Sequence, residues 1–309
     1  MLARLLLTLS LAFLCAGSLQ AADAVVVIVS SERSASYMEA SEALLVELER
    51  GGLARREVLQ ITVAELPAAG TLAPRVFVTL GTEAAGLLAK REWPAAVLCT
   101  LLPRASFDRI TRETGRRPSS QFSALYLNQP FTRQLDLIRL ALPHVRRIGV
   151  LWGPESQVQT AAFQAAARDR GLALVSAQVG LNEPIFPSLK RVLEDSDVLL
   201  AVADPQVYNG GSLQNILLSS FRGRVPMVAF SPAYVRAGAL LAVHATPSQI
   251  GRQAAVMVGR VLDGKALPAT PQYPQDFSIS VNEHVARSLG LALDSKSLSE
   301  QLRQLERAK

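Results

Sequence analysis

Residues 146–204 alternate short apolar runs with a helix-like stretch, and they constrain the fold more than any other part of the chain. Residues 147–152 form one apolar run, and residues 195–203 hold a second one that ends at an Asp-Pro pair. Strands that are buried on both faces have this appearance, because crossover helices cover both sides of a parallel sheet. Ligands of such sheets bind outside the carboxyl ends of the strands. The pattern therefore predicts that function lies in the loops at residues 152–155 and 204–208.

The same alternation of strand-like and helix-like segments runs through the rest of the 309-residue chain. It forms two series that divide near residues 122–145, and only the polar, basic residues 104–121 read as a loop with at most one helical turn. The length and the 49% hydrophobic content suit about two domains. We therefore predict an α/β fold of two lobes with parallel sheets. A cleft between two lobes is a favoured place for a small ligand.

Residues 1–21 predict a cleavable signal peptide. Arg4 supplies a positive charge, residues 5–16 form an apolar run of signal-peptide length, and small residues follow it. An N-terminal core helix is disfavoured, because the run has no polar face. A large residue, Leu14, precedes Cys15, whereas lipid attachment needs a small residue there, so we expect no lipoprotein. The predicted location is the periplasm.

The formal net charge of +6 does not indicate a nucleic-acid partner. The basic residues occur as dispersed pairs without interleaved aromatic residues, so we expect no nucleic acid to bind. No apolar run after residue 21 approaches the length of a membrane span, and we expect no integral membrane segment after signal removal. Cys99 would then be the sole cysteine, and its apolar surroundings predict a buried structural thiol.

Catalytic and metal-binding patterns are poorly represented. None of the three histidines, His144, His244 and His284, has metal-ligand spacing with another His or with a Cys. Residues 81–86 have glycine at the first and sixth positions, but Glu83 stands at the third, where its carboxylate would oppose a pyrophosphate. The sequence also lacks a Gly-x-Ser-x-Gly elbow and a P-loop. We therefore predict that the protein is not an enzyme and has no cofactor or metal.

Four candidate ligand-binding residues follow predicted strands of the first series. Ser30 and Ser31 end the first strand, and their hydroxyls can bind a polar ligand or cap the next helix, a role for which Ser34 competes. Gly81 and Thr82 join a strand to a helix N-terminus, whose free N–H groups can hold an anion such as a ligand carboxylate. Alternatively, Thr82 is only the N-cap of that helix.

Three further candidates end predicted strands of the second series. Trp152 can pack over a ligand or close the core, and its place before Gly153 favours the ligand. Asp204 can hold a ligand amine or hydroxyl, act at a hinge, or merely cap the loop before Pro205. His244 ends a strand and is a candidate for facing the cleft.

Five segments of the chain together resemble the ABC-transporter substrate-binding proteins of the tryptophan/tyrosine-binding type. The segments follow in order through nearly the whole chain after the signal, at residues 78–85, 142–151, 238–241 with 250–255, 277–282 and 288–291. The resemblance implies a type I periplasmic binding protein, with two Rossmann-like lobes that are joined by crossover segments and trap a ligand by closure. By position, it implies ligand contacts from Ser31, Thr82, Trp152, Pro154, Asp204 and Ser231.

The resemblance also implies the domain boundaries. The helix at residues 249–262 would return to the first lobe, and the last strand would return to the second. Lobe 1 is then predicted at residues 22–127 plus 246–269, lobe 2 at 128–245 plus 270–294, and an exposed C-terminal tail at 295–309.

Three departures from the family pattern bear on the ligand. Gly153 stands where members often have Asn, Pro232 where they often have Asp, and the region of His244 lacks a frequent Asp. Fewer side-chain amides and carboxylates then remain to hold an amino-acid zwitterion, which favours a less polar ligand.

Three functions fit these features in decreasing order. The first is a monomeric solute-binding protein that delivers a small organic, amino-acid-like ligand to an ABC permease. The second is a ligand-sensing module that reports to a membrane sensor without transport. The third is an exported enzyme, which is weakest because the sequence offers no nucleophile–base pair.

Overall fold

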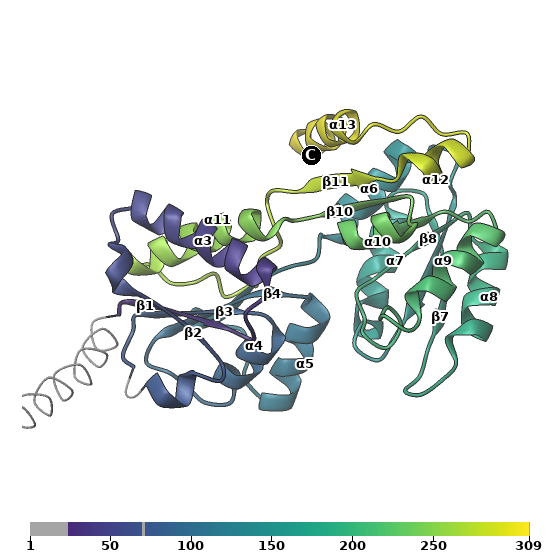
Figure 1. Cartoon of the computed structure of the whole chain (residues 1–309). Coiled ribbons are helices and arrows are strands. Elements are labelled where there is room, and N and C mark those ends of the chain that lie inside the picture. Colours follow the sequence, from purple (N-terminus) through teal and green to yellow (C-terminus); the bar gives the residue numbers. More distant parts are fainter. Residues whose placement is uncertain (1–23, 70–71, 309) are drawn as a thin grey trace, which may run out of the picture. The chain divides into compact units, whose positions relative to one another are not determined.

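The chain divides into two compact units, described here by a computed structural model that covers residues 24–69 and 72–308. Unit 1 comprises Met1–Leu127 and Pro247–Gln275, and unit 2 comprises Asn128–Thr246 and Asp276–Lys309 (Figure 1). The chain therefore passes between the units three times, and we name these passages the first, second and third crossings. The predicted signal peptide lies outside the described residues.

Unit 1 is built on a five-stranded parallel sheet in the order β2-β1-β3-β4-β5. Strands β3 and β4 are buried along their whole length, which explains their continuous apolar sequence. Helices α3 and α11 lie on one face of the sheet and α4 and α5 on the other (Figure 1). The strands are β1 (Val26–Ser30), β2 (Val58–Thr62), β3 (Val76–Leu80), β4 (Ala96–Leu102) and β5 (Phe122–Tyr126). The helices are α3 (Ala35–Arg50), α4 (Thr82–Ala89), α5 (Arg104–Thr114) and α11 (Pro247–Leu262), with short 3-10 turns at Arg55–Glu57 and Leu66–Ala69.

Helix α11 returns the chain to unit 1 by packing closely against α3. A Cβ atom at Gly251 would overlap the backbone carbonyl oxygen of Ala40 and would lie 3.0 Å from the Cβ of Ala43. Glycine is needed here for the close approach of the two helices.

The prediction of a loop over residues 104–121 is wrong, because residues 104–114 form the three-turn helix α5. Its buried face carries Phe107 and Ile110, which are three residues apart, whereas charged residues fill most of the remaining surface. The helix ends at Gly115, whose φ of 70° is left-handed. Because most residues of this helix are charged or polar, its narrow apolar stripe does not stand out in the sequence.

Unit 2 is built on a six-stranded sheet in the order β11-β10-β9-β8-β6-β7. All neighbours pair in parallel except β10 and β11, which are antiparallel. The strands are β6 (Arg147–Trp152), β7 (Ala173–Gln178), β8 (Val198–Leu200), β9 (Met227–Ala229), β10 (Leu241–His244) and β11 (Ser278–Val281). The helices are α6 (Phe131–Ala141), α7 (Thr160–Arg168), α8 (Ile185–Asp195), α9 (Leu213–Arg222), α10 (Pro232–Ala237), α12 (Glu283–Ser288) and α13 (Ser295–Arg307), with a 3-10 turn at Gln157–Gln159. The two sheets with their covering helices confirm the predicted α/β class with two Rossmann-like lobes.

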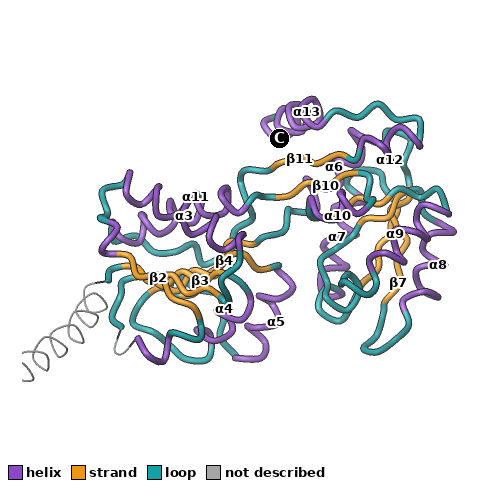
Figure 2. Tube along the Cα trace, in the orientation of Figure 1, coloured by secondary structure: helices purple, strands orange, loops and turns teal. Residues whose placement is uncertain are grey.

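The structure differs from the predicted boundaries at two places in the C-terminal part. Residues 270–275 belong to unit 1, where Gln272 bridges to Leu125 beside the sheet. Residues 295–307 form helix α13 (Figure 2). They are not an exposed tail, because Leu298 and Leu302 are buried in the core of unit 2 that also contains α6 residues. Their spacing of four residues places both side chains on one face of the helix.

The thiol of Cys99 lies fully buried in β4, as predicted. Burial raises its pKa to about 12. Because the thiolate is the reactive form, the native thiol should stay unreactive at every pH below about 12. We expect negligible labelling of Cys99 by a maleimide at pH 8 and complete labelling in denaturant, measured by mass spectrometry with Cys99→Ser as control. Rapid labelling of the native protein would contradict the burial.

Candidate functional site

The carboxyl edge of the unit 1 sheet gathers the four residues that the sequence singled out. Ser30 ends β1 opposite Leu80 of β3, so Ser31 and Gly81 follow neighbouring strands. The Ser31 hydroxyl donates to the Leu80 carbonyl oxygen at 3.1 Å and accepts the N–H of Ala84 at 3.0 Å. Ser31 therefore joins β1 to the first turn of α4.

Gly81 is the N-cap of α4, and its φ of 96° favours glycine. A Cβ atom there would lie 2.6 Å from the Ser31 hydroxyl and would overlap the hydroxyl of Tyr37. Tyr37 thus belongs to this cluster, although nothing in the sequence marked it beyond its place in the first turn of a helix. Burial, followed by the charge of Glu32, raises the pKa of Tyr37, so its hydroxyl is protonated at neutral pH.

The N-terminus of α4 has backbone donors available for an anion. Thr82 is the first residue of the helix rather than its N-cap, and Gly81 has no side chain with which to cap it. Ser31 accepts the Ala84 N–H, but within the described part of the chain no acceptor faces the N–H groups of Thr82 and Glu83. Such groups at a helix N-terminus bind carboxylates and other anions.

The structure places Trp152 in the core of unit 2. Its side chain is 1% exposed and packs edge to face with Phe163 and Phe131, with ring centroids 5.7 and 6.5 Å apart. These contacts give Trp152 a packing role, and its predicted contact with a ligand stays a prediction. Both faces of β6 are buried, so the apolar run alone could not show which side Trp152 takes.

Asp204 holds two loops together at the carboxyl edge of the unit 2 sheet. Its side chain is buried and accepts the N–H groups of Glu155 at 3.1 Å, Ser156 at 2.8 Å and Gln206 at 3.0 Å. A carboxylate that is engaged in this way orders the loops and has little left for a ligand. The structure gives Asp204 a loop-positioning role, and its predicted contact with a ligand stays a prediction.

Gly153 is explained by the same carboxylate. A Cβ atom at this position would overlap the Asp204 carboxylate oxygens. The loop after β6 can approach Asp204 only because the residue there has no side chain. Glycine in place of the family's frequent Asn therefore allows this close packing. Pro154, the next residue, remains partly exposed on this edge.

Three aromatic side chains form a cluster at the same edge, and the sequence analysis did not identify them as candidates. The ring centroids of Phe230 and Tyr234 are 4.8 Å apart, and those of Tyr208 and Phe230 are 6.1 Å apart. The Tyr234 hydroxyl donates to the Tyr208 carbonyl oxygen at 3.3 Å. Ser231 lies within this cluster as the N-cap of α10, where its side chain makes no capping bond. Two positions in the sequence could have identified this cluster. Phe230 directly follows β9, and Tyr208 ends the predicted 204–208 loop.

Tyr208 is the most enclosed member of this aromatic cluster. It is 5% exposed, and its hydroxyl has no hydrogen-bond partner among the residues that the structure describes. Burial is the largest cause that raises its pKa, far above the ordinary range for tyrosine. The hydroxyl therefore stays neutral and keeps a donor to offer.

His244 ends β10 and is engaged within the sheet. Its Nε2 atom lies 3.0 Å from the Ser280 hydroxyl of β11. Burial lowers its pKa, so the ring is neutral at pH 7. Its predicted contact with a ligand stays a prediction.

Residues 24–69 and 72–308 contain no group of three or more His, Cys, Asp or Glu side chains arranged for a metal ion. No helix within these two ranges has the length and apolar character needed to cross a bilayer.

Solved structures similar to this chain share its two-lobed fold. A domain from Streptococcus pneumonia in complex with L-Trp aligns with a TM-score of 0.61 and 17% identity, covering 88% of this chain and 97% of that one. A ligand-free, open substrate-binding protein with adhesive properties from Clostridium difficile aligns with a TM-score of 0.68 and 17% identity, covering 87% and 96%.

Sequence comparisons give the family. A tyrosine-binding protein of Clostridioides difficile (strain R20291) is 22% identical over 171 residues, which are 54% of this chain. The match spans about half the length of that relative, 48%. The model of the family described as ABC transporter substrate binding protein matches residues 62–303. The chain belongs to the ABC transporter substrate-binding protein family.

Proposed function

We propose that this protein captures a small aromatic compound that carries a carboxylate group, such as an aromatic amino acid, and delivers it to an ABC importer. The observation that carries the proposal is the N-terminus of α4, where the N–H groups of Thr82 and Glu83 face no acceptor within the described residues. A carboxylate is one of the anionic groups that such donors bind.

The aromatic cluster of unit 2 supports the proposal that the ligand is aromatic. Phe230 and Tyr234 are partly exposed and offer ring faces and edges to a ligand, while the buried Tyr208 ring packs behind them. Aromatic pairs contribute about 0.5–1.5 kcal/mol beyond the burial of their area. Relatives and neighbours with similar folds are named for binding tyrosine and L-Trp, which agrees with this chemistry.

Export and transport are part of the same proposal. Residues 1–21 would direct the chain to the periplasm and be removed, and an ABC permease would receive the ligand. The predicted placement of the ligand between the lobes belongs to this proposal as well.

A thermal-shift screen of the protein with the twenty amino acids and simple aromatic carboxylates tests the proposal. At a concentration about 100 times the dissociation constant, a ligand adds about 2.7 kcal/mol to the free energy of unfolding. For lobes of this size we expect the melting temperature to rise by about 5–10 °C with an aromatic acid. No rise with any aromatic acid, together with a clear rise for an aliphatic or cationic compound, would contradict the proposal.

A further inference from the structure

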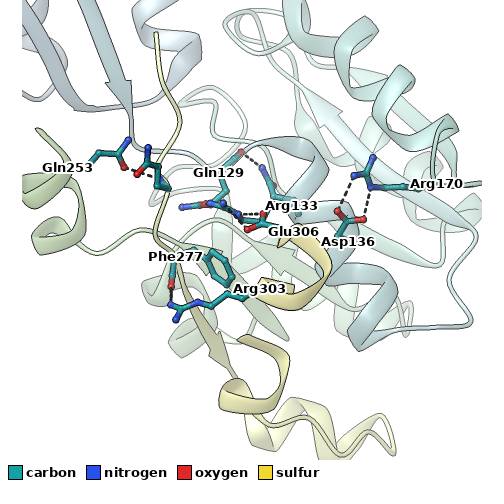
Figure 3. Close-up of polar contacts among 10 residues, drawn as sticks. Gln129, Arg133, Asp136, Arg170, Gln253, Phe277, Arg303 and Glu306 are labelled. Carbon is teal, nitrogen blue, oxygen red and sulfur yellow. Dashed lines mark hydrogen bonds and ion pairs between the residues drawn. The ribbon is translucent and has the colours of Figure 1, made fainter. Parts of the chain in front are cut away.

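Arg133 of α6 is a nearly buried cation that binds the C-terminal helix. Its side chain is 9% exposed, and its Nε and Nη2 atoms donate to the two carboxylate oxygens of Glu306 at 2.5 and 3.0 Å (Figure 3). A two-point bond of this kind fixes both the position and the plane of the guanidinium. Helix α13 therefore sets where the Arg133 side chain points.

The same guanidinium contacts the chain where it enters unit 2 at the first crossing. Its Nη1 atom donates to the Gln129 side-chain oxygen at 2.6 Å, and Gln129 is the second residue of unit 2 (Figure 3). The next residue of the helix, Gln134, donates from its side chain to the Gln129 carbonyl oxygen at 2.7 Å. Helix α6 thus holds Gln129 by both its backbone and its side chain.

The guanidinium also contacts the chain at the third crossing. Phe277 is the second residue after that crossing, and the Arg133 guanidinium carbon lies 4.7 Å from its ring centroid. Arg303 of α13 lies 5.3 Å from the same ring centroid and donates to the Phe277 carbonyl oxygen at 3.4 Å. Two cations, one from α6 and one from the C-terminal helix, therefore hold this ring.

In unit 1, Gln253 of α11 holds the chain just before the same crossing. Its side-chain nitrogen donates to the Tyr273 carbonyl oxygen at 3.2 Å, and its oxygen accepts the Gln275 N–H at 2.8 Å. Each unit by itself therefore fixes the backbone next to the third crossing. Hinges in proteins are commonly a few residues that absorb the change in backbone angles, and here Asp276 is left between the two held segments.

We propose that Arg133, held by Glu306, is a positioning residue that fixes the chain at the first and third crossings and so sets the affinity for ligand. The inference rests on the proposed function, because it assumes that ligand binding moves one unit relative to the other. Held crossings leave fewer conformations to be lost when the ligand binds. Loosening them should weaken binding without any change in the residues that touch the ligand.

The chain offers a matched control on the same helix. Asp136 of α6 binds Arg170 at 2.8 and 3.0 Å, and both side chains are at most 10% exposed. This pair joins α6 to the residues that follow α7 (Figure 3). Asp136→Asn should destabilise unit 2 as much as Glu306→Gln, yet leave the crossings held.

Hydrogen exchange of the ligand-free protein, measured by mass spectrometry, tests the positioning role directly. Glu306→Gln and Arg133→Lys should speed exchange of amides in residues 128–134 and 276–281 by about tenfold or more, because local opening costs less free energy. Lysine keeps the charge but cannot bind Glu306 and Gln129 at once. Asp136→Asn should leave residues 276–281 unchanged. If Glu306→Gln and Arg133→Lys both keep the native exchange rates at the first and third crossings, the inference is overturned, whatever the ligand is.

Calorimetry with L-tryptophan and L-tyrosine tests the link to binding. Glu306→Gln should weaken the affinity by about threefold to tenfold, the size expected for a residue that acts through coupling. Asp136→Asn should keep the native affinity. Faster exchange with an unchanged affinity in Glu306→Gln would overturn the link to binding. Failure of the native protein to bind either amino acid would count against the proposed function alone, since the exchange result decides the positioning role.

Discussion

Asp136→Asn should lower the free energy of unfolding by about 3–5 kcal/mol, because it leaves the guanidinium of Arg170 buried without its carboxylate. The two side chains are 5% and 10% exposed, so water cannot replace the lost partner. Urea denaturation of the native protein and the variant measures the difference.

The surface pair of Arg50 and Glu47 supplies the control for this prediction. Its side chains are 70% and 31% exposed, and exposed pairs contribute at most about 1 kcal/mol. Arg50→Gln should therefore change the unfolding free energy far less than Asp136→Asn. Equal losses in the two variants would show that burial of the Asp136 pair does not decide its contribution.

Asp204→Ala should cost about 3–5 kcal/mol of unfolding free energy. Three backbone N–H groups lose their acceptor. The Ser156 group is buried and loses about 1–3 kcal/mol, while the Glu155 and Gln206 groups are partly buried and lose less each, because water can replace part of the contact. Thermal or urea unfolding measures the loss. Ser231→Ala, which removes a hydroxyl that makes no capping bond at the same edge, should leave stability almost unchanged.

The same variant distinguishes a loop-positioning carboxylate from a ligand-binding one. A carboxylate that contacted the ligand would lower affinity in Asp204→Ala and leave the unfolding free energy near the native value. A stable variant with lost binding would therefore contradict the role that the structure gives to Asp204.

The fold could be predicted because buried parallel strands leave a continuous apolar sequence. Strands β3, β4 and β6 are covered on both faces, and each reads as an apolar run of five to seven residues. Helix α5 could not be predicted in the same way, because only a narrow stripe with Phe107 and Ile110 is buried beneath a charged surface. The packing of residues 295–307 on unit 2 was missed for a similar reason, since a charged helix was expected there and Leu298 and Leu302 alone mark its buried face among polar residues.

The candidate site could be predicted in its location but not in all its side chains. The rule that ligands bind beyond the carboxyl ends of strands pointed to Ser31, Gly81 and Asp204, and all three lie at such edges. Trp152 shares its core with Ile148 and Val150, while Leu151 faces the other core of unit 2. Alternation along β6 therefore decides the direction of Trp152, and a strand that is apolar on both faces gives no sign of it.

The roles of Gly153 and Tyr208 depend on contacts between distant parts of the sequence. Gly153 is required by Asp204, which lies about fifty residues later in the chain. Tyr208 gains its aromatic neighbours Phe230, which follows β9, and Tyr234 of α10 from more than twenty residues away. Sequence patterns are local, and such contacts become visible only once the strands are placed side by side.

Calorimetric titration with an aromatic amino acid and with its carboxamide tests the central claim most directly. If the N–H groups of Thr82 and Glu83 hold the ligand carboxylate, L-tryptophan or L-tyrosine should bind and the matching amide should bind at least about tenfold more weakly, a difference of about 1.4 kcal/mol. Equal affinities for acid and amide, or binding of neither, would contradict the account.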